Sequence, residues 1–259
     1  MVALGRSYLI ATIAFLYLPI VVLVAMAFNA SALYALPIEP SLRWFAVLAD
    51  NGPLLAATRN SLVIACATSV IATTLGTLAA LALNRRQFRG RSLLRLLLLP
   101  PIAIPWLITG TAMLVFFFWT GIGRGIHAMM IGHVALAIPY AVLIVGTGLQ
   151  TLRADLEEAA MSLGSTPVHA FFSITLPLLL PSIVAATLFA FAVSLDQFVV
   201  SYFLSTPGVS TLPVEIYASI RKGFTPEINA ISTIFLGVST ALVLIFVQLS
   251  KFGGKLDRS

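Results

Sequence analysis

The chain has 259 residues, of which 59% are hydrophobic and only 9% are charged, and its formal net charge is +6. A soluble domain usually carries about 25% charged residues, so this composition excludes a soluble globular protein and indicates a chain surrounded largely by lipid. The Arg and Lys residues cluster in particular loops, which argues for membrane orientation and against nucleic-acid binding.

Long apolar runs predict an all-α membrane protein with six spans, in a single domain over 1–259. The first run, Tyr8 to Phe28, is longer than the roughly 7–15 residues of a signal-peptide core, so we expect an uncleaved helix. Pro100, Pro101 and Pro105 predict a kink near the start of the third span. The expected spans are 8–28, 61–83, 93–119, 131–149, 178–203 and 230–249.

The positive charges predict how these spans are oriented. Ten of the fifteen Lys and Arg residues fall on the side of the loop between the second and third spans, and five fall on the other side. Cytoplasmic loops carry the excess of positive charge, so we expect both termini and this loop to lie in the cytoplasm. The Arg-rich segment Arg85–Arg95 also suits anionic membrane lipid, although orientation alone explains its charge.

The loop between the fourth and fifth spans, 151–177, predicts a helix–turn–helix on the cytoplasmic face. Asp155 can cap the first helix, and Glu158 follows three residues later, as in a capping box. Gly164 suits the left-handed residue that ends a helix, and a Ser–Thr pair followed by Pro167 can begin the next one. Rigid helices held between two spans are what a docking element requires.

The composition of this loop distinguishes two interpretations. Ala159 and Ala160 give a small-residue face that another protein surface can approach closely. The alternative is an amphipathic loop resting on the lipid surface, which requires Lys and Arg on its polar face. Arg153 instead stands alone against the acids Asp155, Glu157 and Glu158, so the sequence favours docking to a protein.

Glu158-Ala159-Ala160, then Gly164, then Ile174-Thr-Leu176-Pro177 resembles the EAA motif of permease subunits of binding-protein-dependent ABC importers. The resemblance implies a type I importer permease fold, in which this loop is the coupling helix seated in a cleft of the ATP-binding subunit. It implies a location in the bacterial inner membrane and three kinds of partner chain: a second permease, two ATP-binding subunits and an external solute-binding protein. ATP and Mg²⁺ belong to the ATP-binding subunits, so we expect no cofactor and no enzymatic site in this chain. The implied coupling residues are Glu157, Glu158, Ala159, Ala160 and Gly164.

The resemblance extends along nearly the whole chain. Asn60–Leu62 is similar to the start of a span in this family, and Ser194–Ser201, Leu212–Tyr217 and Thr225–Ala230 are similar to spermidine/putrescine permeases. This points to the second permease of a polyamine system. Those permeases often have two adjacent acids where this chain has Asp196-Gln197. Importers of opines, aminoethylphosphonate and other small solutes share much of the pattern and remain alternatives.

Asp196 is the only acidic residue well inside an expected span. An ionised carboxylate at membrane depth usually faces a cavity or a partner, so Asp196 either attracts an ammonium group in the solute path or hydrogen-bonds a neighbouring helix through Asn60 or Gln150. Glu215, on an outer loop, either meets a cationic solute or is simply solvated. Tyr202 either lines the path or anchors the membrane interface. The candidate substrate path is therefore Asp196, Tyr202 and Glu215.

Other kinds of site receive little support from the sequence. His127, His133 and His169 are too scattered for a metal site, and Cys66 lies in an apolar run without ligand neighbours. Gly253–Lys255 lacks the full spacing of a phosphate loop. An intramembrane enzyme would need a nucleophile–base or metal constellation within the spans. An ion-coupled secondary transporter would usually show inverted repeats and more buried ionisable groups.

Overall fold

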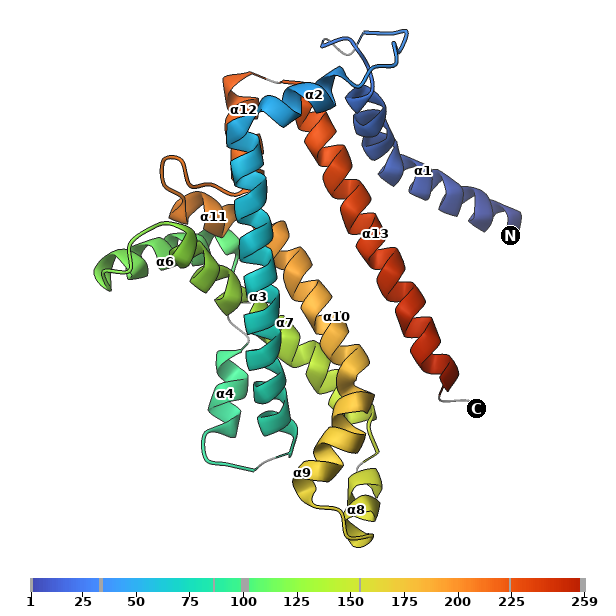
Figure 1. The fold of residues 1–259 in the computed structure, drawn as a ribbon, viewed down its shortest axis with the longest axis vertical. Helices are drawn as coiled ribbons and strands as arrows, with labels where there is room; N and C mark the ends of the chain where they lie inside the picture. Colours follow the sequence, from blue (N-terminus) through green and yellow to red (C-terminus); the bar gives the residue numbers. More distant parts are fainter. Residues whose placement is uncertain are drawn as a thin grey trace. The chain divides into compact units, whose positions relative to one another are not determined.

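The computed structural model of the protein describes residues 2–32, 35–85, 87–98, 103–153, 155–223 and 225–256, with side chains described for all of these except 2–4 and 242–256. Over these residues the named elements are all helices, accompanied by two isolated β-bridges (Figure 1). The predicted all-α class is therefore confirmed.

The helices follow one another along the chain with short connections. They are α1 (Val2–Ala27), α2 (Arg43–Asp50), α3 (Gly52–Arg85), α4 (Arg91–Leu97), α6 (Trp106–Trp119), α7 (Ile126–Thr151), α8 (Asp155–Ser162), α9 (Pro167–Ala170), the π-helix η1 (Phe171–Thr175), α10 (Leu176–Leu195), α11 (Phe198–Leu204), α12 (Leu212–Lys222) and α13 (Glu227–Leu256).

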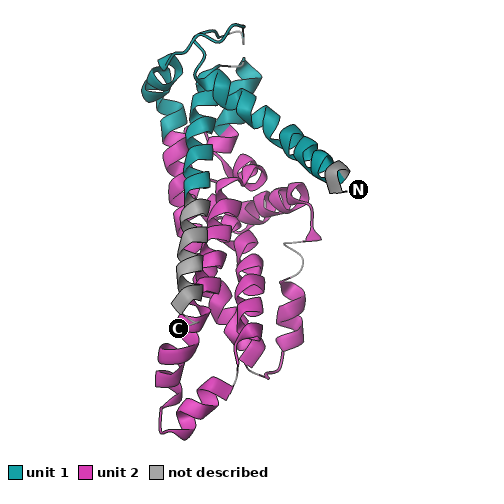
Figure 2. Cartoon of the chain, turned by 90° about the vertical axis from the view of Figure 1, so that its right-hand side faces the viewer, with its two compact units in different colours: residues 1–55, 215–259 teal, residues 56–214 magenta. Residues whose placement is uncertain are grey.

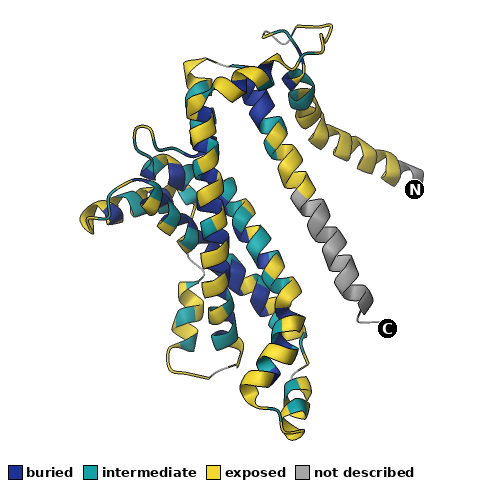
Figure 3. Ribbon diagram, in the orientation of Figure 1, coloured by how far each residue is buried: buried dark blue, intermediate teal, exposed yellow. Residues whose placement is uncertain are grey.

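The chain divides into two compact units (Figure 2). Unit 1 comprises Met1–Leu55 and Glu215–Ser259, and within it α1 and α2 each pack against α13. The buried Asn29 ties down the segment that follows α1, because its backbone carbonyl accepts a 2.6 Å hydrogen bond from the indole N–H of Trp44. Most of α1 presents exposed apolar side chains within this unit (Figure 3), a surface that lipid or another protein must cover.

Unit 2, Ala56–Val214, is built on α7 and α10, which pack along each other. Small residues bring its helices close together. A Cβ placed on Gly76 of α3 would lie only 2.5 Å from the Cβ of Ala141 on α7. One on Gly148, near the end of α7, would overlap Ser182 of α10. Close backbone approach through Gly and Ala is the usual way that helices associate in membranes.

A single continuous rod of 29 residues runs from Pro167 to Leu195 through α9, η1 and α10. Its end is set by Gln197, which leaves the helical conformation at ψ 91° and caps α11. The span expected over 178–203 is therefore not one continuous helix. In Figure 1, α8 and α9 lie at one end of α10, and α11 lies at the other.

Four helices of the described chain are long and apolar enough to cross a membrane: Gly5–Ala27, Gly52–Arg85, Ile126–Thr151 and Pro167–Leu195. These correspond to the first, second, fourth and fifth expected spans. The sixth expected span lies within α13, whose side chains beyond 241 are outside the described residues.

The third expected span, 93–119, contains α4 and α6. The 14 residues of α6 extend about 21 Å, less than the roughly 30 Å of a bilayer core. Pro105 directly precedes α6, in agreement with the predicted interruption near the start of this span. Pro100 and Pro101, which also carried that prediction, lie outside the described residues.

Candidate functional site

The loop between α7 and α10 forms the helix–turn–helix that its residues predict. α8 ends at a turn in which Gly164 has φ +96°, and the amide of Ser165 donates back to the carbonyl of Ala160 at 3.0 Å. This bond closes the terminal turn of α8 around a left-handed residue. The hydroxyl of Thr166 then accepts from the amide of His169 at 3.3 Å, and Pro167 occupies the first turn of α9. The predicted turn at Gly164 and the predicted start of the second helix are therefore confirmed.

Asp155 is the first residue of α8, and its carboxylate binds Arg153. The guanidinium donates to the two carboxylate oxygens at 2.6 and 3.2 Å. The hydrogen bond from Arg153 lowers the pKa of Asp155 below its usual value, and the same bond raises the pKa of Arg153. Both side chains are well exposed, so this ion pair adds little stability.

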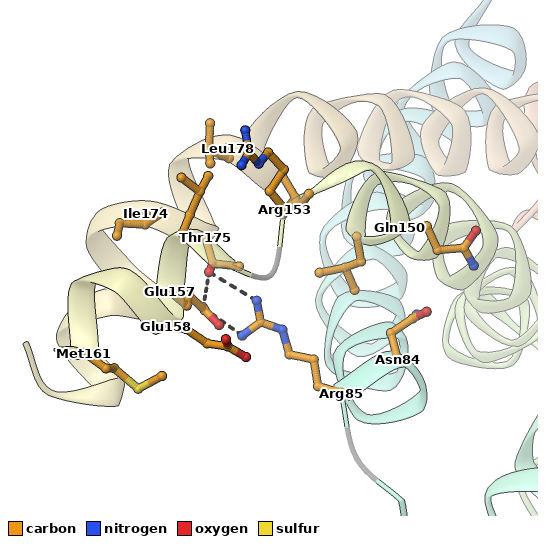
Figure 4. A pocket seen from close by; sticks show the side chains of 13 residues that line it. Asn84, Arg85, Gln150, Arg153, Glu157, Glu158, Met161, Ile174, Thr175 and Leu178 are labelled. Carbon is orange, nitrogen blue, oxygen red and sulfur yellow. Dashed lines mark hydrogen bonds and ion pairs between the residues drawn. The ribbon is translucent and has the colours of Figure 1, made fainter.

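Glu157, by contrast, joins three elements (Figure 4). Its carboxylate accepts a 2.8 Å ion-pair hydrogen bond from Arg85 at the end of α3, and another from the hydroxyl of Thr175 in η1. Arg85 also donates to the Thr175 hydroxyl oxygen at 3.2 Å. We call Arg85, Glu157 and Thr175 the Glu157 cluster. Sequence reasoning treated Arg85 as an orientation charge or a lipid-binding charge and gave Thr175 no role.

The Glu157 cluster lies in a cavity of about 500 Å³. Partial burial there raises the pKa of Glu157, but the hydrogen bonds from Thr175 and Arg85 outweigh it and leave the pKa below its usual value. The carboxylate thus stays ionised at neutral pH and holds α8 to α3 and η1. Glu158 lines the same cavity from an exposed position.

The exposed surface of this loop includes small and apolar side chains beside its polar ones. Ala159 is exposed and Ala160 half-buried, so the small-residue face is accessible in this chain. Leu163, in the turn after α8, is 90% exposed. Phe171 is half-buried, with the Arg85 guanidinium 5.9 Å from its ring centroid. Its neighbour Phe172 is the exposed ring.

Asp196 lies in the break between α10 and α11, with its side chain exposed. Asn60 and Gln150 were the partners considered for a structural role. Asn60 instead donates to the carbonyl of Ser210 at 3.0 Å, and Gln150 lines the cavity beside Glu157. The structure therefore gives neither proposed partner to Asp196.

The other two residues of the candidate path lie on different elements. Tyr202 is exposed on α11, with its ring centroid 5.5 Å from that of Phe198. Tyr202 and Asp196 both belong to unit 2, whereas Glu215, half-buried in the first turn of α12, begins the second segment of unit 1. Two of the three predicted residues therefore belong to unit 2, and the third belongs to unit 1.

Comparison with known proteins identifies the family. Residues 72–251 match the family described as "Binding-protein-dependent transport system inner membrane component". The chain belongs to this family. It is a permease subunit of a binding-protein-dependent ABC importer, and this excludes the intramembrane enzyme and the secondary transporter.

Two curated relatives cover most of the chain. It is 38% identical over 231 residues to the "Putrescine transport system permease protein PotI" of Escherichia coli (strain K12), covering 86% of this chain and 82% of the relative. It is 32% identical over 241 residues to the "Spermidine/putrescine transport system permease protein PotC" of the same strain, covering 93% and 91%.

Solved structures show the same fold at low sequence identity. A chain of a bacterial ABC transporter that imports the acidic polysaccharide alginate superposes with a TM-score of 0.73 at 18% identity, covering 98% of this chain and 94% of that one. A chain of the MetNI methionine ABC transporter gives 0.62 at 17% identity, covering 82% and 99%. The family member is thus a multi-pass inner membrane protein that works with a binding protein and with ATPase subunits, in which ATP hydrolysis lies.

Proposed function

We propose that this permease subunit carries polyamines, putrescine or spermidine, into the bacterial cell. The observation that carries the proposal is the identity of 38% and 32% to permeases named for putrescine and for spermidine/putrescine transport, over most of the chain. The exposed carboxylate of Asp196, at a helix break in an apolar chain, is the kind of group that an ammonium ion needs. Opines and aminoethylphosphonate are the alternative solutes.

The complete importer contains a second, similar permease, two ATP-binding subunits and an external solute-binding protein. This chain contributes one permease domain over 1–259 with six spans, because α13 covers the sixth expected span and α4 and α6 flank the interruption in the third. The ten-to-five division of Lys and Arg supports cytoplasmic termini. ATP and Mg²⁺ bind in the partner ATPase, and this chain holds no cofactor.

The loop of α8 and α9 is the coupling element, and Glu157, Glu158, Ala159, Ala160 and Gly164 are its working residues. Its exposed apolar and small side chains suit a groove on the ATPase. Glu157 supports the transmission of movement, because it links α8 to α3 and, through Thr175, to the rod that ends at the Asp196 break. ATP-driven closure then rocks the helices between inward-facing and outward-facing states.

Asp196 offers the solute a transient counter-charge. A bare ammonium in a low-dielectric passage carries a desolvation cost of several kcal/mol, which an opposite charge reduces. One carboxylate provides a site without holding a divalent cation too tightly. Tyr202 lines the same path. Glu215 meets the cationic solute or the binding protein near the outer loop.

Uptake of labelled putrescine and spermidine by the complete importer in proteoliposomes tests this function. Asp196→Asn keeps the shape of the side chain and removes its charge, so uptake per assembled complex should fall by at least about tenfold. Asp50→Asn, at an exposed acid that ends α2, is the matched control and should retain uptake. Unchanged uptake by Asp196→Asn would refute the role of Asp196. A binding protein that ignores polyamines and holds a neutral or anionic solute would refute the substrate.

A further inference from the structure

A buried imidazole in unit 2 joins the two helices that flank the Asp196 break. His133 of α7 is 2% exposed, and its Nδ1 lies 2.8 Å from the hydroxyl of Ser194 in the last turn of α10. Its Nε2 lies 2.9 Å from the hydroxyl of Ser201 in α11. Both serines are buried. We call His133, Ser194 and Ser201 the His133 cluster.

The chemistry of the three side chains matches this bridge. A neutral imidazole offers one N–H donor and one acceptor nitrogen on opposite sides of a rigid ring, and each serine hydroxyl can rotate to donate or accept. Either tautomer of His133 therefore satisfies both serines without placing a charge inside the helix packing. The rigid ring also fixes the distance between the two hydroxyls that it connects.

The helices are in close contact at this point. Gly132 precedes His133 on α7, and a Cβ placed on Gly132 would lie 2.8 Å from the side chain of Val200 on α11. Val200 itself is fully buried, in an apolar cluster that includes Met129 of α7. The hydrogen bonds of His133 thus lie beside a packed contact, and movement of α11 relative to α7 would strain the bond to Ser201.

The backbone of the break is only partly held from within. The amide of Asp196 donates to the carbonyl of Ala192 at 3.1 Å, which keeps Asp196 on the last turn of α10. Gln197 departs from the helix and caps α11 through a long hydrogen bond of 3.5 Å from the amide of Val200 to its side-chain oxygen. Its side-chain nitrogen is buried and finds no hydrogen-bond partner in the described part of the chain. The direction of α11 relative to α10, which carries Asp196, therefore depends largely on contacts from outside the break.

We propose that His133 is a positioning residue for solute passage, holding α10 and α11 together across the break so that the Asp196 carboxylate stays in the path. His133 does not touch the solute, because the helices bury it on every side. The inference rests on the proposed role of Asp196 and adds to it the group that orients this carboxylate.

A double-mutant cycle between His133→Phe and Asp196→Asn tests the inference in the complete importer. Phe keeps a planar ring and removes both hydrogen bonds. Uptake of labelled putrescine is measured per assembled complex, above the background of vesicles without ATP. If His133 acts through the carboxylate, His133→Phe lowers uptake at least about tenfold when residue 196 is the native Asp. In the Asp196→Asn background, the same change lowers uptake less than about twofold. His127→Phe, the same change at an exposed position of α7, is the control and retains uptake.

Two results would overturn the positioning role of His133 without affecting the proposed path. The first is uptake by His133→Phe within about twofold of wild type. The second is an equal loss in both backgrounds, which indicates a purely structural role. If His133→Phe does not assemble, the smaller change Ser194→Ala with Ser201→Ala enters the same cycle with the same criteria. Full uptake by Asp196→Asn alone would instead overturn the proposed path, and the inference with it.

Discussion

The two ends of the α9–η1–α10 rod are held by different chemistry. At the α8 end, the Glu157 cluster uses an ion pair that remains partly open to solvent. At the α11 end, the His133 cluster uses two hydrogen bonds among buried hydroxyl and imidazole groups. Where water reaches, charged groups separate and re-form at little cost, whereas deep among apolar helices a separated charge is expensive. The comparison indicates that the α8 end can move, whereas the α11 end keeps a fixed geometry.

The largest effect is expected at the turn that shapes the α8 end. Gly164→Val forces a β-branched residue into φ +96°, where no neighbour lies within 4 Å, so the whole penalty is conformational. Strain of about 1–2 kcal/mol or more lowers the population of the docking shape of this turn, relative to its other shapes, by roughly five- to thirtyfold. Stimulation of ATP hydrolysis by loaded binding protein should fall accordingly. Gly164→Asn, which tolerates left-handed geometry, should restore most of it, and normal transport by Gly164→Val would show that the turn is not required.

A smaller effect is expected from the ion pair of the Glu157 cluster. Glu157→Gln removes the charge that holds Arg85, a coupling of up to about 1 kcal/mol for a partly exposed pair. The folded-state pKa of Glu157 lies below its ordinary 4.5, so its stabilisation is present above pH 4.5 and is lost as the pH falls through the lower folded value. The thermal unfolding temperature of the purified complex should therefore be lower for Glu157→Gln than for wild type at pH 7. The two temperatures should converge in acid.

Arg85→Gln supplies the control for this measurement. In that background Glu157→Gln should have a reduced effect at pH 7, because the ion pair is already absent. A pH-independent difference between Glu157→Gln and wild type would contradict the assignment of this stabilisation to the Glu157 carboxylate.

The smallest effect sharpens the distinction between an ion pair that links elements and one that does not. Arg153 and Asp155 pair closely, but they are two residues apart and both are well exposed. Arg153→Ala should leave the thermal stability of the complex close to that of wild type and leave coupling intact. A loss of binding-protein-stimulated ATP hydrolysis in Arg153→Ala would instead assign this exposed pair to the docking surface.

Local signals explain what could be predicted from the sequence. The turn at Gly164 and the start of α9 at Pro167 depend on a few adjacent residues, and the structure reproduces both. The end of α10 was missed because Asp196-Gln197 interrupts an apolar run by only two residues, without Gly or Pro. The break depends on Gln197 leaving helical geometry and capping α11, which no periodicity reveals.

The long-range contacts could not be predicted in the same way. Arg85 and Glu157 are separated by 72 residues, and His133 and Ser201 by 68. A single histidine in an apolar run gives no pattern that distinguishes a bridge between helices from an ordinary buried side chain. Family resemblance could identify the loop that docks, because its motif is local, but not the residues that connect this loop to the rest of the unit.

The π-helix η1 acts as one extra residue inserted into the rod. The amide of Leu176 reaches back to the carbonyl of Phe171, five residues earlier, instead of the usual four. A π-turn takes up its extra residue locally, so the helices on either side of it keep nearly the phase of an uninterrupted α-helix that is one residue shorter. Deleting one residue of Phe171–Thr175 should therefore leave Ala170 buried and α8 facing the same way, whereas deleting one residue from the regular part of α10 should rotate everything before it by about 100°. The orientation of the docking loop thus depends on the number of residues in the regular helix, and a change of length should be tolerated in η1 far better than in α10.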